Sequence, residues 1–321
     1  MSWPEILQET EKYVEPLEQH YPRYFEEIRG IAAGAGLQYL DVLALNVRTE
    51  ISFGLFSDTA KKLDVPSDGC TALGWLIGGE SFLAQNWDWM IEQSYSLVVC
   101  HVSQPGTDIP DFSMVTEAGI IGKIGMNSMG VGTLLNAIRC RGVDRSKMPT
   151  HFALRKVLES GSREEAVATI KSTGIAGSGH ILVGDPTGST GLECTSNWVK
   201  ELVMDSQGRV CHSNHLVLEH SDVDEAPWLA DSPERLARIK ELTSGISESS
   251  STTIFNVFKD TLGFPASIDR KTTGTNTTET LFNIVMNLSD KSVTVTVGRP
   301  SGYSEQLTWS FGQKANGTIS V

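Results

Sequence analysis

Cys70, in the segment 67–71 (Ser-Asp-Gly-Cys-Thr), combines a potential nucleophile with a preceding glycine. A thiol attacks as its thiolate, and a cysteine with an ordinary pKa of about 8.5 is mostly protonated at neutral pH. An α-amino group, with an ordinary pKa of about 7.7–8.0, would be a usable base if Cys70 became a chain terminus. Gly69 gives the backbone freedom for the thiol to reach the preceding carbonyl. The pattern favours a nucleophile exposed by a cut between Gly69 and Cys70, although such a cysteine taken alone is more often a small buried residue.

Asp88 lies between two tryptophans in the segment 85–89 (Gln-Asn-Trp-Asp-Trp), at the end of a strand-like run. A carboxylate in such apolar company must be paired or hydrogen-bonded. It is placed to hold the ammonium form of a new Cys70 terminus or to orient a substrate. The alternative is an aspartate in a turn with tryptophans packed on either side.

The segment 212–215 (His-Ser-Asn-His) holds two further kinds of candidate. Two histidines three residues apart suggest a metal, but no pattern of cysteine or carboxylate completes a ligand set, so we predict no metal site. Asn214 carries an amide that can donate to an oxyanion, as acyl transfer requires. The alternative is a turn after a strand at 209–211, and the segment 127–130 (Asn-Ser-Met-Gly) is likewise typical of a hairpin turn.

These residues need a scaffold, and the hydrophobic periodicity changes along the chain to provide one. Up to residue 53 the pattern is helical, with helices expected at 2–17, 24–31 and 40–53. A polar segment at 57–68 leads to Cys70, and strands dominate after it. Strands are expected at 71–77, 81–86, 96–102, 119–126, 130–137, 179–184, 199–204, 280–288 and 292–297. Further helices are expected at 149–160, 163–172, 232–243 and 251–262. Many strands interrupted by paired helices favour stacked sheets covered by helices.

Composition excludes several classes of function. The chain has 321 residues, a net charge of −13 and 40% hydrophobic residues. This acidity argues against binding to nucleic acid, which needs a dense basic face. No stretch approaches the ~18 apolar residues of a membrane span. Five widely spaced cysteines indicate separate thiols in a reducing compartment, and with no targeting segment we expect a cytoplasmic protein.

Segments spread over nearly the whole chain resemble one family. They are residues 24–32, 45–50, 68–71, 85–88, 116–123, 212–215, 280–284 and 298–300. Taken in order, they are similar to the fungal isopenicillin N acyltransferases (acyl-coenzyme A:6-aminopenicillanic acid acyltransferases), which are N-terminal-nucleophile hydrolases. Two features differ from that family. Its Ser-Arg pair falls here on Asn276-Thr277, although Arg270 is kept, and its peroxisomal tail is replaced by Ile319-Ser320-Val321.

The resemblance implies an α+β fold, a four-layer αββα sandwich formed by residues 1–321 as a single domain. It implies self-cleavage into an α subunit, 1–69, and a β subunit, 70–321, which remain together as a heterodimer. Cys70 would be the nucleophile, Asp88 a supporting carboxylate and Asn214 an oxyanion donor. The implied chemistry is acyl transfer through a thioester, from an amide or acyl-coenzyme A to an amine such as 6-aminopenicillanic acid, without a bound cofactor.

Two other functions fit the same residues. One is a plain amide hydrolase, resembling penicillin V acylases and conjugated bile-acid hydrolases, in which water is the only acceptor. The other is a non-processing pseudoenzyme that binds a small amide. The product formed from an acyl-coenzyme A and an amine separates transfer from hydrolysis, and an intact precursor that binds ligand would indicate the pseudoenzyme.

Overall fold

The computed structural model describes residues 1–55, 69–221, 223–226, 229–274 and 277–312. The α-helices are α1 Trp3–Glu11, α2 Val14–His20, α3 Pro22–Ala35, α4 Tyr39–Asn46, α5 Thr150–Leu158, α6 Arg163–Thr173, α7 Ser232–Thr243 and α8 Ser251–Val257, with a π-helix at Glu50–Gly54 and a 3₁₀-helix at Ile91–Ser96. The strands up to β8 are β1 Gly69–Ile77, β2 Glu80–Met90, β3 Leu97–Val102, β4 Phe112–Glu117, β5 Ile124–Asn127, β6 Gly132–Asn136, β7 Cys140–Arg141 and β8 Gly179–Asp185. The remaining strands are β9 Gly188–Cys194, β10 Val199–Val203, β11 Arg209–His212, β12 Asp224–Glu225, β13 Thr278–Asn287, β14 Ser292–Val297 and β15 Glu305–Ser310.

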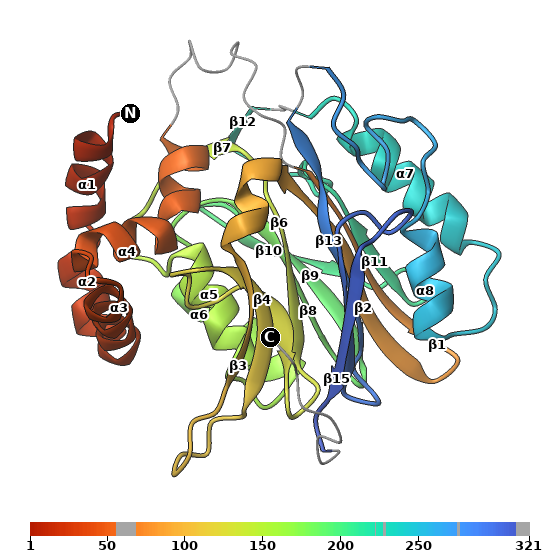
Figure 1. Cartoon of the computed structure of the whole chain (residues 1–321), viewed down its shortest axis with the longest axis horizontal. Coiled ribbons are helices and arrows are strands. Elements are labelled where there is room, and N and C mark those ends of the chain that lie inside the picture. The colour runs from red at the N-terminus through yellow and green to blue at the C-terminus, as the bar shows by residue number, and fades with distance from the viewer. Residues whose placement is uncertain (56–68, 222, 227–228, 275–276, 313–321) are drawn as a thin grey trace.

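Two antiparallel sheets form the centre of the molecule. One has the strand order β11-β1-β2-β13-β14-β15, and the other has the order β10-β9-β8-β6-β5-β4-β3. The sheets contact each other through β1 and β2 on one side and β6, β8 and β9 on the other. Helices α7 and α8 cover the outer face of the first sheet, and α5 and α6 cover that of the second (Figure 1). The expected four-layer αββα sandwich is confirmed.

The first four helices form a group beyond α5 and α6, at the left of Figure 1. Helix α1 begins with a capping box: the Glu5 carboxylate accepts hydrogen bonds from both the backbone N–H and the hydroxyl of Ser2, as the sequence predicted for a helix start at Ser2. Helix α4 contacts α5, and α5 in turn contacts the second sheet. This group of helices therefore packs on the helix layer that covers that sheet. The predicted single helix over 2–17 is interrupted at residues 12–13, between α1 and α2.

Strand alternation gives β1 two different faces. Cys70 and Ala72 belong to the large core cluster that fills the space between the sheets, whereas Leu73 and Trp75 pack with residues of α7 and α8. In β2, Trp87 belongs to the first of these clusters. Because successive side chains in a strand point to opposite faces, the Cys70 thiol is directed to the space between the sheets and its neighbours to the helix layer.

The expected strand at 119–126 is confirmed only over residues 124–126, and the part at 119–123 is wrong. Strand β4 ends at Glu117, a turn follows, and β5 begins at Ile124. Ile120 and Ile121 are buried in that turn, which explains why the segment resembles a strand in sequence. The turn is stabilised by the side chain of Asn46, which donates to Gly119 O (2.8 Å) and accepts from Ile121 N (3.0 Å).

Other expected elements were longer than the observed ones, and some observed strands were not expected. Helix α8 ends at Val257 rather than near 262. The helix expected at 40–53 is α4, which ends at Asn46 and is followed by the separate π-helix. Strands β4, β9 and β15 had no counterpart among the expected elements. The turn at 127–130 is confirmed, because the Asn127 side chain accepts hydrogen bonds from the N–H groups of Met129 and Val131.

Within the described ranges, no helix is both long enough and apolar enough to cross a bilayer.

Gly122 sets how closely the turn after β4 approaches α5. A methyl group at this position would lie 2.1 Å from His151 O and 2.6 Å from Arg155 N, both backbone atoms. We therefore expect Gly122→Ala to lower the free energy of unfolding by about 1–3 kcal/mol or more, measured by denaturant titration. Gly30→Ala in α3 is the matched control, since no atom lies within 4 Å of the place that its methyl group would take. It should raise stability by about 0.5–1 kcal/mol, and equal effects of the two variants would contradict the packing argument.

Candidate active site

Strand β1 begins at the Gly69–Cys70 bond and runs antiparallel to β2. Gly69 is opposite Asp88, and Cys70 is opposite Trp87. A methyl group on Gly69 would lie 2.8 Å from Asp88 Oδ2 and 3.2 Å from Arg270 Nε. Glycine is thus required here because the backbone passes directly beside a carboxylate and a guanidinium. The sequence had suggested backbone freedom as the reason, whereas the structure shows a need for space.

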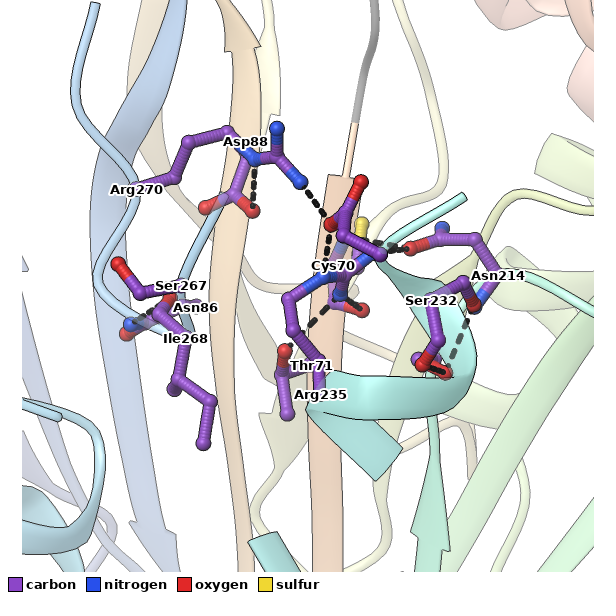
Figure 2. Close-up of polar contacts among 12 residues, drawn as sticks. Cys70, Thr71, Asn86, Asp88, Asn214, Ser232, Arg235, Ser267, Ile268 and Arg270 are labelled. Atoms are coloured by element: carbon purple, nitrogen blue, oxygen red, sulfur yellow. Dashed lines mark hydrogen bonds and ion pairs between the residues drawn. The ribbon is translucent and has the colours of Figure 1, made fainter. Parts of the chain in front are cut away.

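Cys70 is held through its backbone on both sides of its α-carbon. Its N–H donates to Asn214 Oδ1 at 2.9 Å, and its carbonyl oxygen accepts from Arg235 Nη1 at 2.8 Å. Arg235 also donates from Nη1 to Thr71 Oγ1 (3.0 Å) and from Nη2 to Asn214 Oδ1 (2.9 Å). Figure 2 shows Cys70 with Asn214 on one side and the pair Asp88–Arg270 on the other. One buried guanidinium therefore fixes the second and third residues of β1 and the asparagine beside them.

Asp88 joins this network indirectly. It is fully buried, accepts a hydrogen bond from Thr280 Oγ1 at 2.6 Å, and pairs with Arg270 Nε at 3.4 Å. Arg270 also pairs with Asp231, whose Oδ2 accepts from Arg235 Nε at 2.6 Å. The chain of contacts thus runs from Asp88 through two arginines to the Cys70 carbonyl.

Burial raises the pKa of Asp88 to about 6, and the charges of Arg270 and Arg235 oppose this increase. Burial also acts to raise the pKa of Asp231, but the same two arginines outweigh it and lower that pKa. The two aspartates and two arginines balance in charge. The carboxylate opposite Gly69 is therefore ionised at neutral pH and becomes neutral in mild acid.

Asn214 is held in place by hydrogen bonds from both its backbone and its side chain. Its backbone N–H donates to Ser232 Oγ, in the first turn of α7, at 2.7 Å. Its side-chain N–H₂ donates to Ala137 O at 3.1 Å, which orients the amide so that Oδ1 faces the Cys70 nitrogen. An amide carries two N–H groups, so one remains beyond the bond to Ala137. The role of oxyanion donor stays a prediction that would use this second N–H.

A buried carboxylate secures the chain after Asn214. Glu193 accepts hydrogen bonds from the backbone N–H groups of Val217 (2.6 Å) and Leu218 (3.0 Å). It also contacts His212 Nε2 at 2.8 Å and His220 Nε2 at 2.9 Å. The histidine that suggested a metal in the sequence is thus part of a hydrogen-bond network around Glu193. Among the residues that the structure describes, no cluster of histidine, cysteine and carboxylate side chains fits a metal ion.

The Cys70 thiol faces a pocket between the sheets. The cavity volume of the pocket is about 30 Å³, and the space around it is partly open to solvent. Aromatic and aliphatic residues form most of its wall, and the polar residues Arg48, Thr49, Lys123 and His151 complete it. The apolar lining residues are Phe53, Trp87, Trp89, Leu135 and Ala137. The chemical character of this lining, though not the size of the cavity, is compatible with an apolar group next to the sulfur.

The charged groups of this pocket are connected by Glu117. Its carboxylate pairs with Arg48 and accepts from Lys123 Nζ at 2.8 Å, and the Lys123 ammonium lies 4.5 Å from the Trp87 ring centroid. Burial acts to raise the pKa of Glu117, but Arg48 and Lys123 outweigh it and hold that pKa well below its usual range. Burial lowers the pKa of Lys123 to about 8, while Glu117 and a Cys70 thiolate act to raise it. Since that coupling is reciprocal, the Lys123 charge favours the thiolate.

The sequence thus identified some of this site and missed the rest. Cys70 and Asn214 are in direct contact, and Asp88 is beside Gly69 on the helix-facing side of the sheet. Arg235 and Asp231 were missed, since an arginine in an ordinary amphipathic helix gives no signal of its own. Of the pair Asn276-Thr277, Asn276 is outside the described residues, and the Thr277 carbonyl accepts from Ile91 N. The positive charge beside Asp88 comes instead from Arg270.

Two stacked antiparallel sheets between helix layers form the αββα fold of the N-terminal-nucleophile hydrolases. Solved structures share this fold. An N-acylethanolamine-hydrolyzing acid amidase ortholog from Caenorhabditis elegans matches with a TM-score of 0.51 and 16% identity, over 68% of this chain and 93% of that chain. A mutant of conjugated bile acid hydrolase from Clostridium perfringens matches with a TM-score of 0.50 and 14% identity, over 78% of this chain and 100% of that chain. At such identities the similarity establishes the fold alone.

Sequence comparison identifies the family within this class. The family model described as acyl-coenzyme A:6-aminopenicillanic acid acyl-transferase matches residues 75–302. The 40 kDa form of acyl-coenzyme A:6-aminopenicillanic-acid-acyltransferase of Emericella nidulans is 36% identical over 310 residues, which are 96% of this chain and 83% of that protein. The chain belongs to the acyl-coenzyme A:6-aminopenicillanic acid acyl-transferase family, a family of enzymes.

The charges around Lys123 give linked predictions for two variants. Lys123→Met removes a cation from the Cys70 pocket, so the pH midpoint for alkylation of Cys70 by iodoacetamide should rise by roughly one unit. Glu117→Gln removes the anion that keeps the buried Lys123 protonated, so the midpoint should rise as well. Mass spectrometry of the Cys70 peptide against pH measures both, and Lys123→Arg, which keeps the charge, serves as the control. A fall of the midpoint in either variant would contradict the electrostatic argument.

Proposed function

We propose that this enzyme transfers acyl groups between amides, acyl-coenzyme A and amines, with Cys70 as an N-terminal nucleophile produced by self-cleavage. The observation that carries the proposal is the position of Cys70 at the first residues of β1, where its nitrogen contacts Asn214 and its thiol faces the apolar pocket. Family membership supports the reaction class. No cofactor is needed for this chemistry, and acyl-coenzyme A acts as a co-substrate.

Self-cleavage comes first in this proposal. The Cys70 thiolate attacks the Gly69 carbonyl carbon, forming a C–S bond, and the Gly69–Cys70 C–N bond breaks. The nitrogen takes up the proton that the thiol released and becomes the α-amine of Cys70. Water then hydrolyses the thioester, leaving a carboxylate on Gly69 and a thiol on Cys70. Asp88 and Arg270 border Gly69 during these steps, and Arg235 holds the Cys70 carbonyl in place.

Acyl transfer uses the same sulfur twice. The new α-amine of Cys70, kept in position by Asn214 Oδ1, accepts the thiol proton as the sulfur attacks the acyl carbonyl. The amine or coenzyme A thiol leaves with that proton, and the acyl group remains as a thioester on Cys70. An acceptor amine then attacks the thioester and returns the proton to sulfur through the α-amine. The second N–H of Asn214 would stabilise the oxyanion formed at each attack.

The fragments 1–69 and 70–321 would remain associated as a heterodimer within one domain. Helix α4 packs on α5, and core residues from both fragments, such as Phe25 and Phe152, belong to one cluster. A nick leaves such a buried interface in place, and dissociation would expose it to water. None of the five cysteines forms a disulfide within the described parts of the chain, which agrees with our proposal of a reducing, cytoplasmic location.

Self-cleavage predicts two fragments from one gene product. Intact-mass analysis of the denatured protein should give masses for residues 1–69 and 70–321, whereas Cys70→Ala should give only the full chain. Cys100→Ala, which changes a cysteine in β3 away from the site, is the matched control and should be cleaved like the wild type. A wild-type protein that stays whole under all conditions would refute the processing step and favour the non-processing ligand-binding alternative.

Transfer and hydrolysis are separated by their products. With phenylacetyl-coenzyme A and 6-aminopenicillanic acid, we expect an amide product and a thioester on the fragment that begins at Cys70, and Cys70→Ala should lose at least about 10³-fold of the rate. Liquid chromatography and mass spectrometry measure both. Release of phenylacetic acid with no amide would instead identify an amide or thioester hydrolase. That outcome would leave the nucleophile assignment standing and remove the transferase assignment.

A further inference from the structure

His151 is the polar group of the Cys70 pocket whose hydrogen bonding is incomplete. It is in the first turn of α5, is fully buried, and lines the pocket together with Cys70 and Trp87. Its Nδ1 is 2.9 Å from the carbonyl oxygen of Gly122. Its Nε2 is buried and has no hydrogen-bond partner among the described residues. A buried polar atom without a partner carries a cost that a bound group can remove.

The tautomer of His151 follows from these contacts. A carbonyl oxygen can only accept, so Nδ1 carries the proton. Burial, together with the charges of Lys123 and Arg48, lowers the pKa of His151 to about 3, which keeps the ring neutral at physiological pH. A neutral ring with the proton on Nδ1 presents a lone pair at Nε2. The unpartnered atom is therefore a hydrogen-bond acceptor, and it requires a donor.

The rest of the pocket restricts what can bring that donor. Apart from Thr49 and the two cations, which are paired with Glu117, the walls beside Cys70 and His151 are aromatic and aliphatic. An apolar, aromatic-compatible group carrying one O–H or N–H matches this lining, since its body would contact Trp87 and Phe53 and its donor would meet Nε2. A purely apolar group of the same size would leave the acceptor unsatisfied.

We propose that His151 is a specificity-determining residue that selects acyl groups bearing a hydroxyl or amino donor away from the reacting carbonyl. This inference rests on the proposed function, because it takes the pocket beside Cys70 as the acyl site. A site with a buried acceptor discriminates against an analogue lacking the donor, since desolvation of the acceptor is then uncompensated. For a single acceptor, the expected preference is roughly 10-fold to 100-fold in acylation rate.

The test compares matched thioesters on the mature enzyme. The rate of Cys70 acylation is measured by intact mass in single turnovers, without an acceptor amine. The donors are coenzyme A thioesters of phenylacetic acid, its 3- and 4-hydroxy derivatives, and the corresponding methyl ethers, which keep the oxygen but lose the O–H. The wild type should acylate faster with at least one hydroxy isomer than with its ether and the unsubstituted acid. His151→Phe should remove that preference, so that the hydroxy, ether and unsubstituted thioesters acylate Cys70 at rates within about threefold of one another.

The outcomes separate this inference from the proposed function. Equal wild-type rates for all the thioesters would overturn the role of His151, while acyl transfer through Cys70 would stand. A hydroxyl preference that persists in His151→Phe would assign the selection to another group and also overturn it. No acylation by any thioester would refute the proposed function, and this inference with it. If His151→Phe fails to fold, the wild-type series and His151→Asn, a smaller polar replacement that should weaken the preference, still decide the question.

Discussion

The geometry at the start of β1 depends on one buried guanidinium. Arg235 donates to the Cys70 backbone carbonyl, the Thr71 hydroxyl, the Asn214 side-chain oxygen Oδ1 and the Asp231 carboxylate. A buried charge is tolerated only when its donors are satisfied, so these four acceptors cannot move independently. Helix α7, the first residues of β1 and the segment after β11 are therefore fixed relative to one another by a single side chain. Asn214 can be placed beside the Cys70 nitrogen only because this arrangement holds both.

The alternation of β1 separates two environments at Cys70. Its backbone lies in a polar network on the helix-facing side, where two arginines and two aspartates balance in charge. Its thiol faces the pocket between the sheets, where Trp87, Phe53 and a paired lysine surround it. Groups that border the peptide bond are thus kept apart from groups that contact an acyl chain. Substitutions on one side of the sheet can alter the acyl site without disturbing the residues around Gly69.

Two buried carboxylates near the site each hold a segment in place. Asp88 is one of them: Arg270 pairs with both Asp88 and Asp231, so the carboxylate opposite Gly69 has a cationic partner. Glu193 plays a comparable part on the other side, where it gathers two backbone N–H groups and two histidines behind Asn214. Asp88 and Glu193 are both buried and hydrogen-bonded, and each anchors a segment that carries a residue of the candidate site.

The sequence by itself determined the family and the layered fold, and it predicted three residues of the candidate site. Local patterns carry that information: periodicity marks helices and strands, and Gly69-Cys70, Asp88 and Asn214 occur in recognisable segments. Only the tertiary structure decided how they are connected. Arg235 in α7 and Asp231 just before that helix lie more than 160 residues after Cys70, and His151 comes from a helix on the opposite layer. Nothing in their local sequence distinguishes them, because their roles arise from burial and from contacts between segments that are distant in the chain.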